Sequence, residues 1–213
     1  AATLDPSGNI CVTGVFIGTV DFDPGPGVAN MAGGGFNRCF ILKLDGNGNY
    51  IQAQQITATY SEGDAVTTDA AGNIFVCGVY TSTADLNPGP GVFNVTATSG
   101  GDAFIVKLDN TGNFVWGKSI GGLGTDNCRT IKTDADGNVY VAGNFPFTTD
   151  FDPGPAVFNI TAAGTSDGYI LKLNTGGDFV WAKVLGGTAA DVAINNTPNT
   201  EIYAHSLHDA LPI

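Results

Sequence analysis

One segment of the sequence is written three times at a nearly fixed spacing. DFDPGPGVAN begins at Asp21, DLNPGPGVFN at Asp85 and DFDPGPAVFN at Asp150, so successive copies lie 64 and 65 residues apart. Repetition at such a period is typical of solenoids, propellers and other arrays, in which each repeat is one supersecondary unit. The period therefore constrains the fold more strongly than any single motif does.

Two further sets of landmarks keep the same period. The turn motif Asp-x-x-Gly-Asn begins at Asp5, Asp69 and Asp134. The segments FILKLDGNGNY, FIVKLDNTGNF and YILKLNTGGDF begin at Phe40, Phe104 and Tyr169. These landmarks divide residues 1–205 into three repeats of a single domain. The repeats change in length by one residue where TATYSEGDA, after the first repeat, corresponds to GGLGTDNCR, after the second. We expect an exposed loop there because insertions fall in exposed connections.

Each repeat contains the pattern of four strands. NIFVCGVY and AFIVKLD are short apolar runs, NFVWGKSI follows a turn, and CRTIKTD leads into the next Asp-x-x-Gly-Asn. Asp and Gly at these turn positions suit tight hairpins. The runs do not alternate cleanly between apolar and polar residues, which predicts burial on both faces. We therefore predict an all-β fold, with about three four-stranded blades of a truncated, open β-propeller.

Three blades are too few for a closed ring, because propellers typically have about 4 to 8. We expect the remaining blades of a longer chain to be partners of this segment. The last eight residues, SLHDALPI at 206–213, fit no repeat. They match one reading frame of a common sequencing-adapter oligonucleotide, so we expect this tail to be non-native.

The combined pattern FIxKLDxxGNxxWxKxxGG and DxxGNxYxxGxF resembles the SBBP-type bacterial β-propeller repeat, which often carries the DFDPGPG segment. The resemblance covers roughly residues 3–194. It implies a propeller in a large secreted or cell-surface bacterial protein, and it brings no general catalytic activity. The first repeat departs from the pattern at Gln52 and Gln54, and the third departs at Asn174 and Asp178.

Composition excludes several classes of function. With 8 basic and 20 acidic residues, the formal net charge is −12, and such a surface repels nucleic acids. No apolar run is long enough to span a membrane. Histidine occurs only at His205 and His208, so the repeats lack the imidazole that nucleophilic triads and most zinc sites use. We therefore expect no enzyme activity. The four cysteines form no CxxC pair, are expected to be mostly buried, and leave their disulfide state open.

The repeated DxDPGPG segment admits two readings. It places oxygen ligands two residues apart in every copy, which suits Ca²⁺, at Asp21, Asp23, Asp85, Asn87, Asp150 and Asp152. The simpler reading is that these side chains cap backbone amides at a turn stiffened by proline. In that reading Phe22, Leu86 and Phe151 are buried beneath the turn.

Trp116 and Trp181 also admit two readings. Aromatic side chains serve as platforms for sugars, but equivalent placement in two repeats favours packing between blades. Lys43, Lys107 and Lys172 share one strand position, where we expect ion pairs with neighbouring acids.

The function that these patterns favour is a non-catalytic scaffold or interaction module, secreted or exposed at the cell surface, for a protein or carbohydrate ligand. The alternatives are part of a carbohydrate-active enzyme and a calcium-stabilised binding module. An enzyme requires an acidic or polar cluster that breaks the repeat symmetry. The sequence shows few asymmetric residues apart from the cysteines, namely Arg38, Glu62 and Arg129.

Overall fold

The computed structural model describes residues 1–189, and this part of the chain contains strands and no helix. None of its elements is therefore a helix that could cross a membrane. The strands are β1 (Ala2–Leu4), β2 (Ile10–Asp21), β3 (Asn30–Leu44), β4 (Tyr50–Thr68), β5 (Ile74–Asp85), β6 (Asn94–Thr96), β7 (Asp102–Leu108), β8 (Phe114–Gly122), β9 (Asn127–Thr133), β10 (Val139–Phe145), β11 (Thr148–Asp150), β12 (Asn159–Thr161), β13 (Asp167–Leu173) and β14 (Phe179–Leu185).

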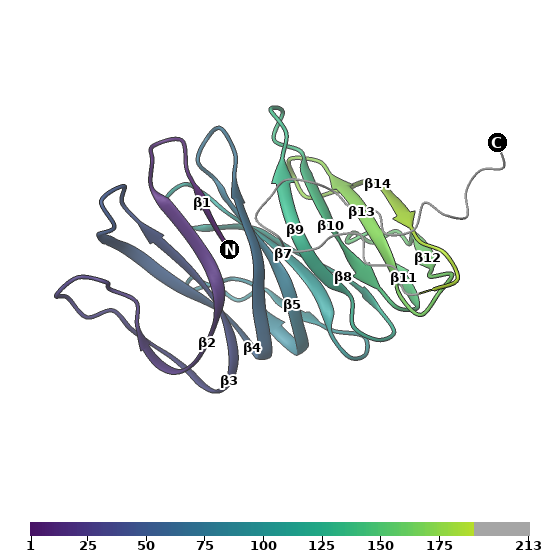
Figure 1. Cartoon of the computed structure of the whole chain (residues 1–213), viewed down its shortest axis with the longest axis horizontal. Coiled ribbons are helices and arrows are strands. Elements are labelled where there is room, and N and C mark those ends of the chain that lie inside the picture. The colour runs from purple at the N-terminus through teal and green to yellow at the C-terminus, as the bar shows by residue number, and fades with distance from the viewer. Residues whose placement is uncertain (190–213) are drawn as a thin grey trace.

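The strands form three four-stranded units that follow the sequence repeats. Unit 1 consists of β1, β2, β3 and residues 50–58 of β4. Unit 2 consists of residues 60–68 of β4 with β5, β7 and β8. Unit 3 consists of β9, β10, β13 and β14, and neighbouring strands pair antiparallel in all three units. The units succeed one another across Figure 1, from the purple N-terminal strands to the green and yellow C-terminal ones.

Strand β4 corrects one expectation from the sequence. The segment TATYSEGDA, predicted to lie in an exposed loop, is part of the continuous 19-residue strand β4, which pairs first with β3 and then with β5. The corresponding segment between units 2 and 3 does leave the sheet, because β8 ends at Gly122 and β9 begins at Asn127. In the first repeat, pairing with β5 provides hydrogen-bond partners for the backbone of this segment, which a loop would expose to water.

The hairpins of each unit close through the predicted turns. In the turn that begins at Asp69, the carboxylate accepts hydrogen bonds from the amides of Ala71 and Asn73 at 3.0 and 2.9 Å. Gly72 has φ of +80°, a left-handed conformation that glycine adopts without a steric penalty. The Asp and the Gly of the motif are thus both required by the geometry of the turn.

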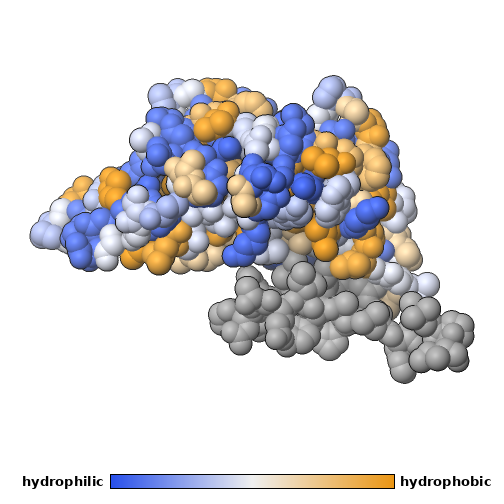
Figure 2. All heavy atoms as spheres, turned by 90° about the horizontal axis from the view of Figure 1, so that it is seen from above, coloured by the Kyte–Doolittle hydropathy of each residue, from blue (hydrophilic) through white to orange (hydrophobic). Residues whose placement is uncertain are grey.

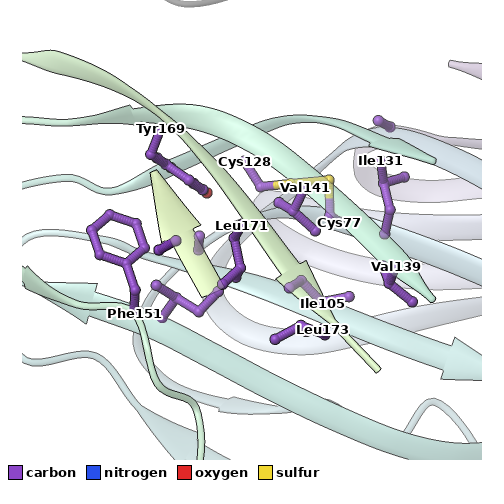
Figure 3. Packing of buried hydrophobic residues seen from close by; sticks show 14 of the residues in the cluster. Cys77, Ile105, Cys128, Ile131, Val139, Val141, Phe151, Tyr169, Leu171 and Leu173 are labelled. Atoms are coloured by element: carbon purple, nitrogen blue, oxygen red, sulfur yellow. A yellow bond between two sulfur atoms is a disulfide. The ribbon is translucent and has the colours of Figure 1, made fainter. Parts of the chain in front are cut away.

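The core lies between the units and not within any one of them. One cluster of buried residues joins unit 1 to unit 2, and a second cluster joins unit 2 to unit 3. Figure 3 shows the second cluster, in which Val141 and Leu171 of unit 3 lie near Ile105 of unit 2. Phe104, Ile105 and Val106 are all fully buried, which confirms the predicted burial on both faces of β7. Consecutive antiparallel sheets that bury both faces against their neighbours fit a β-propeller.

Candidate functional site

The DxDPGPG segments form hairpin tips that link the second and third strands of each unit. In the second repeat, Asp85 Oδ1 accepts hydrogen bonds from the amides of Asn87 and Phe93 at 3.0 and 2.8 Å. Asn87 Oδ1 in turn accepts from the amide of Gly89 at 2.9 Å. One side-chain oxygen therefore closes the base of the turn, and the next side chain closes its tip.

The other two copies repeat this arrangement. Asp21 Oδ1 accepts from the amides of Asp23 and Ala29, and these hydrogen bonds lower the pKa of Asp21. Asp150 Oδ1 accepts from the amides of Asp152 and Phe158. Asp23 and Asp152 each accept one further amide hydrogen bond, from Gly25 and Gly154. The capping role predicted for the six side chains is confirmed. The buried residues beneath the tips are Phe22, Leu86 and Phe151.

The base of each hairpin also reaches the neighbouring unit. Asp85 and Ala84 pair with Thr57 and Ala58 at the point where β4 leaves unit 1. In the third repeat, Asp150 and Thr149 pair with Gly121 and Gly122 at the end of β8. The hairpin of one unit therefore adds a strand to the outermost strand of the preceding unit. The sequence predicted the turn itself, but it carried no sign of this cross-unit pairing.

Acidic side chains gather at the junctions between units, close to the hairpin bases. Asp64 of β4 and Arg129 of β9 form an ion pair with Nη1 and Oδ2 3.7 Å apart. Burial raises the pKa of Asp64 to about 6, although Arg129 acts in the opposite direction. Glu62 accepts hydrogen bonds from Asn37 and from the Tyr60 hydroxyl. Glu62 and Arg129, which the sequence marked as breaking the repeat, therefore lie at inter-unit contacts.

Two further buried carboxyl groups lie between units 2 and 3. Burial raises the pKa of Asp126 to about 6, although Asp126 accepts hydrogen bonds from the Thr149 hydroxyl at 2.6 Å and the Gly122 amide at 2.9 Å. Burial likewise raises the pKa of Asp102 to about 6, and the nearby Asp126 raises it further. Asp102 Oδ1 is buried and accepts no hydrogen bond from any described residue.

Sequence reasoning missed Asp64, Asp102 and Asp126 as members of a cluster. The available signal was that the position of Asp102 is occupied by Arg38 in the first repeat. Among residues 1–189, no group of three or more His, Cys, Asp or Glu is arranged to hold a metal ion. The cluster offers buried proton-binding groups, and Arg129 provides one positive charge near them.

The opposite ends of the units meet through the repeated lysines. Lys43 Nζ lies 3.0 Å from Asp5 Oδ2, with both side chains almost fully buried, and donates a hydrogen bond to the Asn110 carbonyl of unit 2 at 2.9 Å. Lys107 Nζ donates to the Thr175 carbonyl of unit 3 at 3.4 Å. A pocket of about 300 Å³ lies beside the Asp5–Lys43 pair.

The ion pairs predicted for these lysines are confirmed at two of the three positions. Lys43 pairs with Asp5, and Lys172 lies 3.9 Å from Asp134. Lys107 instead stacks over the ring of Phe75, 5.1 Å from its centroid. All three lysines thus tie turns to strands, which is the architectural role that repetition indicated.

Trp116 packs between units, as its repeated position predicts. Its indole Nε1 donates to the Thr175 carbonyl of unit 3 at 3.3 Å, and its ring meets the edge of Phe75. Trp181 makes the corresponding ring contact with Tyr140 within unit 3.

The cysteines distinguish the two junctions. Cys77 of β5 and Cys128 of β9 form a disulfide between units 2 and 3, within the apolar cluster of Figure 3. Cys11 and Cys39 are buried free thiols of unit 1, and burial raises the pKa of each, to about 11 and about 12. The expectation of buried cysteines is confirmed, and the structure adds the pairing that spacing left open.

No protein-family model matches the chain. The chain is 30% identical over 175 residues to an uncharacterized WD repeat-containing protein of Acanthamoeba polyphaga mimivirus. The match covers 67% of this chain and 12% of the viral protein, so the chain spans about an eighth of that relative's length. WD repeats build β-propeller blades. The fold and this similarity together indicate a β-propeller-like repeat scaffold.

Proposed function

We propose that the chain is a non-catalytic scaffold or interaction module, built from SBBP-type propeller repeats, in a large secreted or cell-surface bacterial protein. The observation that carries this proposal is the repeated construction of its two junctions. At each junction the base of a hairpin pairs with the outer strand of the preceding unit. A lysine of one unit donates a hydrogen bond to a turn of the next unit, and an apolar cluster fills the space between the two sheets. Residues that recur at both junctions have a structural role, because a catalytic site needs only one copy of its residues.

The disulfide supports an extracytoplasmic location. Disulfides persist in oxidising compartments and are rare in the cytosol. Alkylation in denaturant, which exposes the buried thiols, of the protein from cells lysed without reductant, followed by mass spectrometry, tests the location. We expect alkylated Cys11 and Cys39 and a Cys77–Cys128 disulfide. Alkylation of all four cysteines in that experiment would contradict a secreted protein.

The absence of catalysis is tested with the purified chain and panels of chromogenic glycosides, esters and phosphate esters. We expect turnover no faster than with heat-unfolded protein, because no histidine precedes residue 205 and the acids are engaged at unit junctions. Turnover that disappears in Asp126→Asn would overturn the proposal.

A carbohydrate-active enzyme is the second candidate, and the acidic cluster favours it. Asp64, Asp102 and Asp126 all have pKa values raised to about 6 by burial, and glycosidases use one carboxyl group with a raised pKa as a general acid. The glycoside panel distinguishes the candidates, since this one requires turnover with an acidic pH optimum.

We also propose that the hairpin tips bind Ca²⁺ and that this binding stabilises the folded chain. The candidate ligands are the side chains that also cap the turns: Asp21, Asp23, Asp85, Asn87, Asp150 and Asp152. The prediction is that millimolar Ca²⁺ raises the melting temperature of the chain, and that Mg²⁺ at equal ionic strength does not. Equal melting temperatures in Ca²⁺ and in chelator would contradict the prediction.

A further inference from the structure

The face of unit 1 that lies opposite unit 2 has the composition of an inter-unit face. Cys11, Cys39 and Ile41 belong to the cluster shared with unit 2. Because side chains alternate along a strand, their neighbours Ile10, Val12, Phe40 and Leu42 lie on the opposite face. That face is apolar, and these four side chains are only partly buried.

The equivalent positions are fully buried in the other two units. In unit 2 these positions, at 0% exposure, are Ile74, Val76, Phe104 and Val106. In unit 3 they are Val139, Val141, Tyr169 and Leu171, at 1% exposure or less. In both cases the preceding unit covers them, since they belong to the clusters at the two junctions. These four positions are therefore buried by the preceding unit in both units that have one in the structure.

The hairpin of unit 1 presents the matching backbone edge. The Phe22 amide donates to the Ala29 carbonyl across the hairpin, and antiparallel pairing alternates the direction of successive amides. The amide of Asp21 therefore points away from β3. Leu86 and Phe151 make the same hydrogen bond to Phe93 and Phe158. In those two hairpins the backbone of Asp85 and of Asp150 pairs with the end of the outer strand of the preceding unit.

The outer strand that meets this edge ends in small residues at both junctions. The strand ends are Thr57-Ala58 and Gly121-Gly122 at the two junctions. A Cβ atom on Gly122 would lie 2.0 Å from the carbonyl oxygen of Thr148, a distance that no packed structure tolerates. The close approach of the two backbones thus excludes any side chain at Gly122, whereas the first junction accepts Ala58 at the same position.

We propose that the open face of unit 1, together with the outward edge of its hairpin at Asp21, is a docking site for a further unit of the same repeat in the same polypeptide. The inference rests on the proposed scaffold function and specifies the partner of its open face. The docking unit pairs the short-residue end of its outer strand with Val20 and Asp21. Its own sheet covers Ile10, Val12, Phe40 and Leu42.

A fusion protein tests the proposal on the full chain. A copy of residues 61–129 placed before Ala1 adds one repeat in register, because Ala1 occupies the position of Thr130. We expect amide hydrogen exchange at Asp21 to slow at least tenfold relative to the unfused chain, in a protein that light scattering shows to be monomeric. The copies of Cys77 and Cys128 then face each other across the new junction, and their disulfide is a second readout.

Two lysine substitutions in the fusion provide a matched pair. Val12→Lys places a charge on the docking face, and we expect it to abolish the slowed exchange and the new disulfide. In the unfused chain Val12 is only partly buried, so a lysine there can reach water; circular dichroism of that variant checks its fold. Val28→Lys is the control, because Val28 and its counterparts Val92 and Val157 are 74%, 72% and 69% exposed in all three units, and it should leave docking intact.

Unchanged exchange at Asp21 in a folded, monomeric fusion overturns the proposal. So does slowed exchange that appears only in dimers, because the occupant would then be a second molecule. Exchange at Asp85, which lies at the existing junction between units 1 and 2, is followed in the same spectra. Strong protection there without protection at Asp21 would leave the scaffold function standing and remove only this docking site.

Discussion

At the scale of single residues, the buried acids at the junctions are the groups whose chemistry departs most from their ordinary behaviour. Asp102 is 3% exposed and has one carboxylate oxygen without a hydrogen-bond partner among the described residues. A buried carboxylate in that condition opposes folding when it is ionised. Asp5 shows the reverse case, because its carboxylate accepts hydrogen bonds from Ser7 and Asn9 and pairs with Lys43.

Replacing Asp102 by Asn is expected to stabilise the protein at neutral pH. Burial raises the pKa of Asp102 from 3.8 to about 6, so the folded state holds the proton more tightly than the unfolded state does. The stability of the parent therefore falls as pH rises from about 4 to about 6. The variant should be more stable by on the order of 1–2 kcal/mol at neutral pH and equal near pH 3.5, as measured by urea unfolding.

Asp167 provides the control for this substitution. It occupies the same position in unit 3, but its two carboxylate oxygens accept hydrogen bonds from the amides of Ala163 and Gly164. An Asn amide would replace one acceptor by a donor, so Asp167→Asn should give no gain. An equal gain in both variants would contradict the role assigned to the unpartnered oxygen.

Lys43→Met is expected to destabilise the protein in a pH-dependent way. Burial alone would raise the pKa of Asp5, but hydrogen bonds from Asn9, Lys43 and the turn amides lower it to about 2. That stabilisation is complete above about pH 4 and is lost as pH falls through about 2. We expect a loss of about 2–4 kcal/mol in unfolding free energy at neutral pH, since one partner of a buried pair is removed. A loss that stays constant down to about pH 2 in urea titrations would argue against the ion pair.

At the scale of elements, the DxDPGPG hairpin performs two tasks with one segment. Its first Asp closes the turn, and the backbone of that same residue pairs with the preceding unit. Two prolines in each tip fix backbone angles, so little conformational freedom is lost when the tip folds. The hairpin is thus a rigid extension of one unit that pairs with the strand of the preceding unit.

Asp85→Ala should destabilise the chain more than Asp85→Asn. Alanine leaves the amides of Asn87 and Phe93 without their acceptor, which is expected to cost about 1–2 kcal/mol. Asparagine retains a side-chain oxygen in the same place, as Asn87 itself shows at the tip, and should cost less than about 0.5 kcal/mol. Thermal unfolding of the two variants measures the difference, and similar losses for both would show that charge, and not hydrogen bonding, stabilises the turn.

At the scale of the whole molecule, stability resides in the junctions, because each sheet buries its apolar side chains against its neighbours. In the view of Figure 2, apolar side chains on the surface of the described part are interspersed with polar ones. The two junctions share hairpins and lysines, but only the second carries a disulfide.

Removing the disulfide with Cys77→Ala and Cys128→Ala should lower the unfolding free energy by about 2–4 kcal/mol. The bond closes a loop across 51 residues of sequence, and that cross-link restricts the unfolded chain. The double variant Cys11→Ala and Cys39→Ala controls for lost sulfur packing. Because it keeps the Cys77–Cys128 bond, reducing agent should destabilise it as much as it destabilises the parent. Equal unfolding of the parent with and without reductant would contradict a stabilising bond.

Much of this architecture could be predicted from the sequence. Fixed spacing revealed the repeats, and Asp-x-x-Gly-Asn revealed the turns, because only glycine adopts the required φ without strain. Capping by Asp21 and its counterparts followed from local chemistry. The continuous strand β4 could not be predicted, since whether residues 57–65 form a loop or a strand depends on the β5 edge beside them.

The sequence by itself determined the all-β character, the repeat boundaries, the turns and the burial of β7, because each depends on residues close together in the chain. Only the tertiary structure decided that the hairpins pair across units, that Cys77 bonds to Cys128, and that Asp102 and Asp126 are buried and Asp64 half-buried at the junctions. These features join residues from different repeats. Their geometry depends on how one sheet packs on the next, which no local pattern encodes.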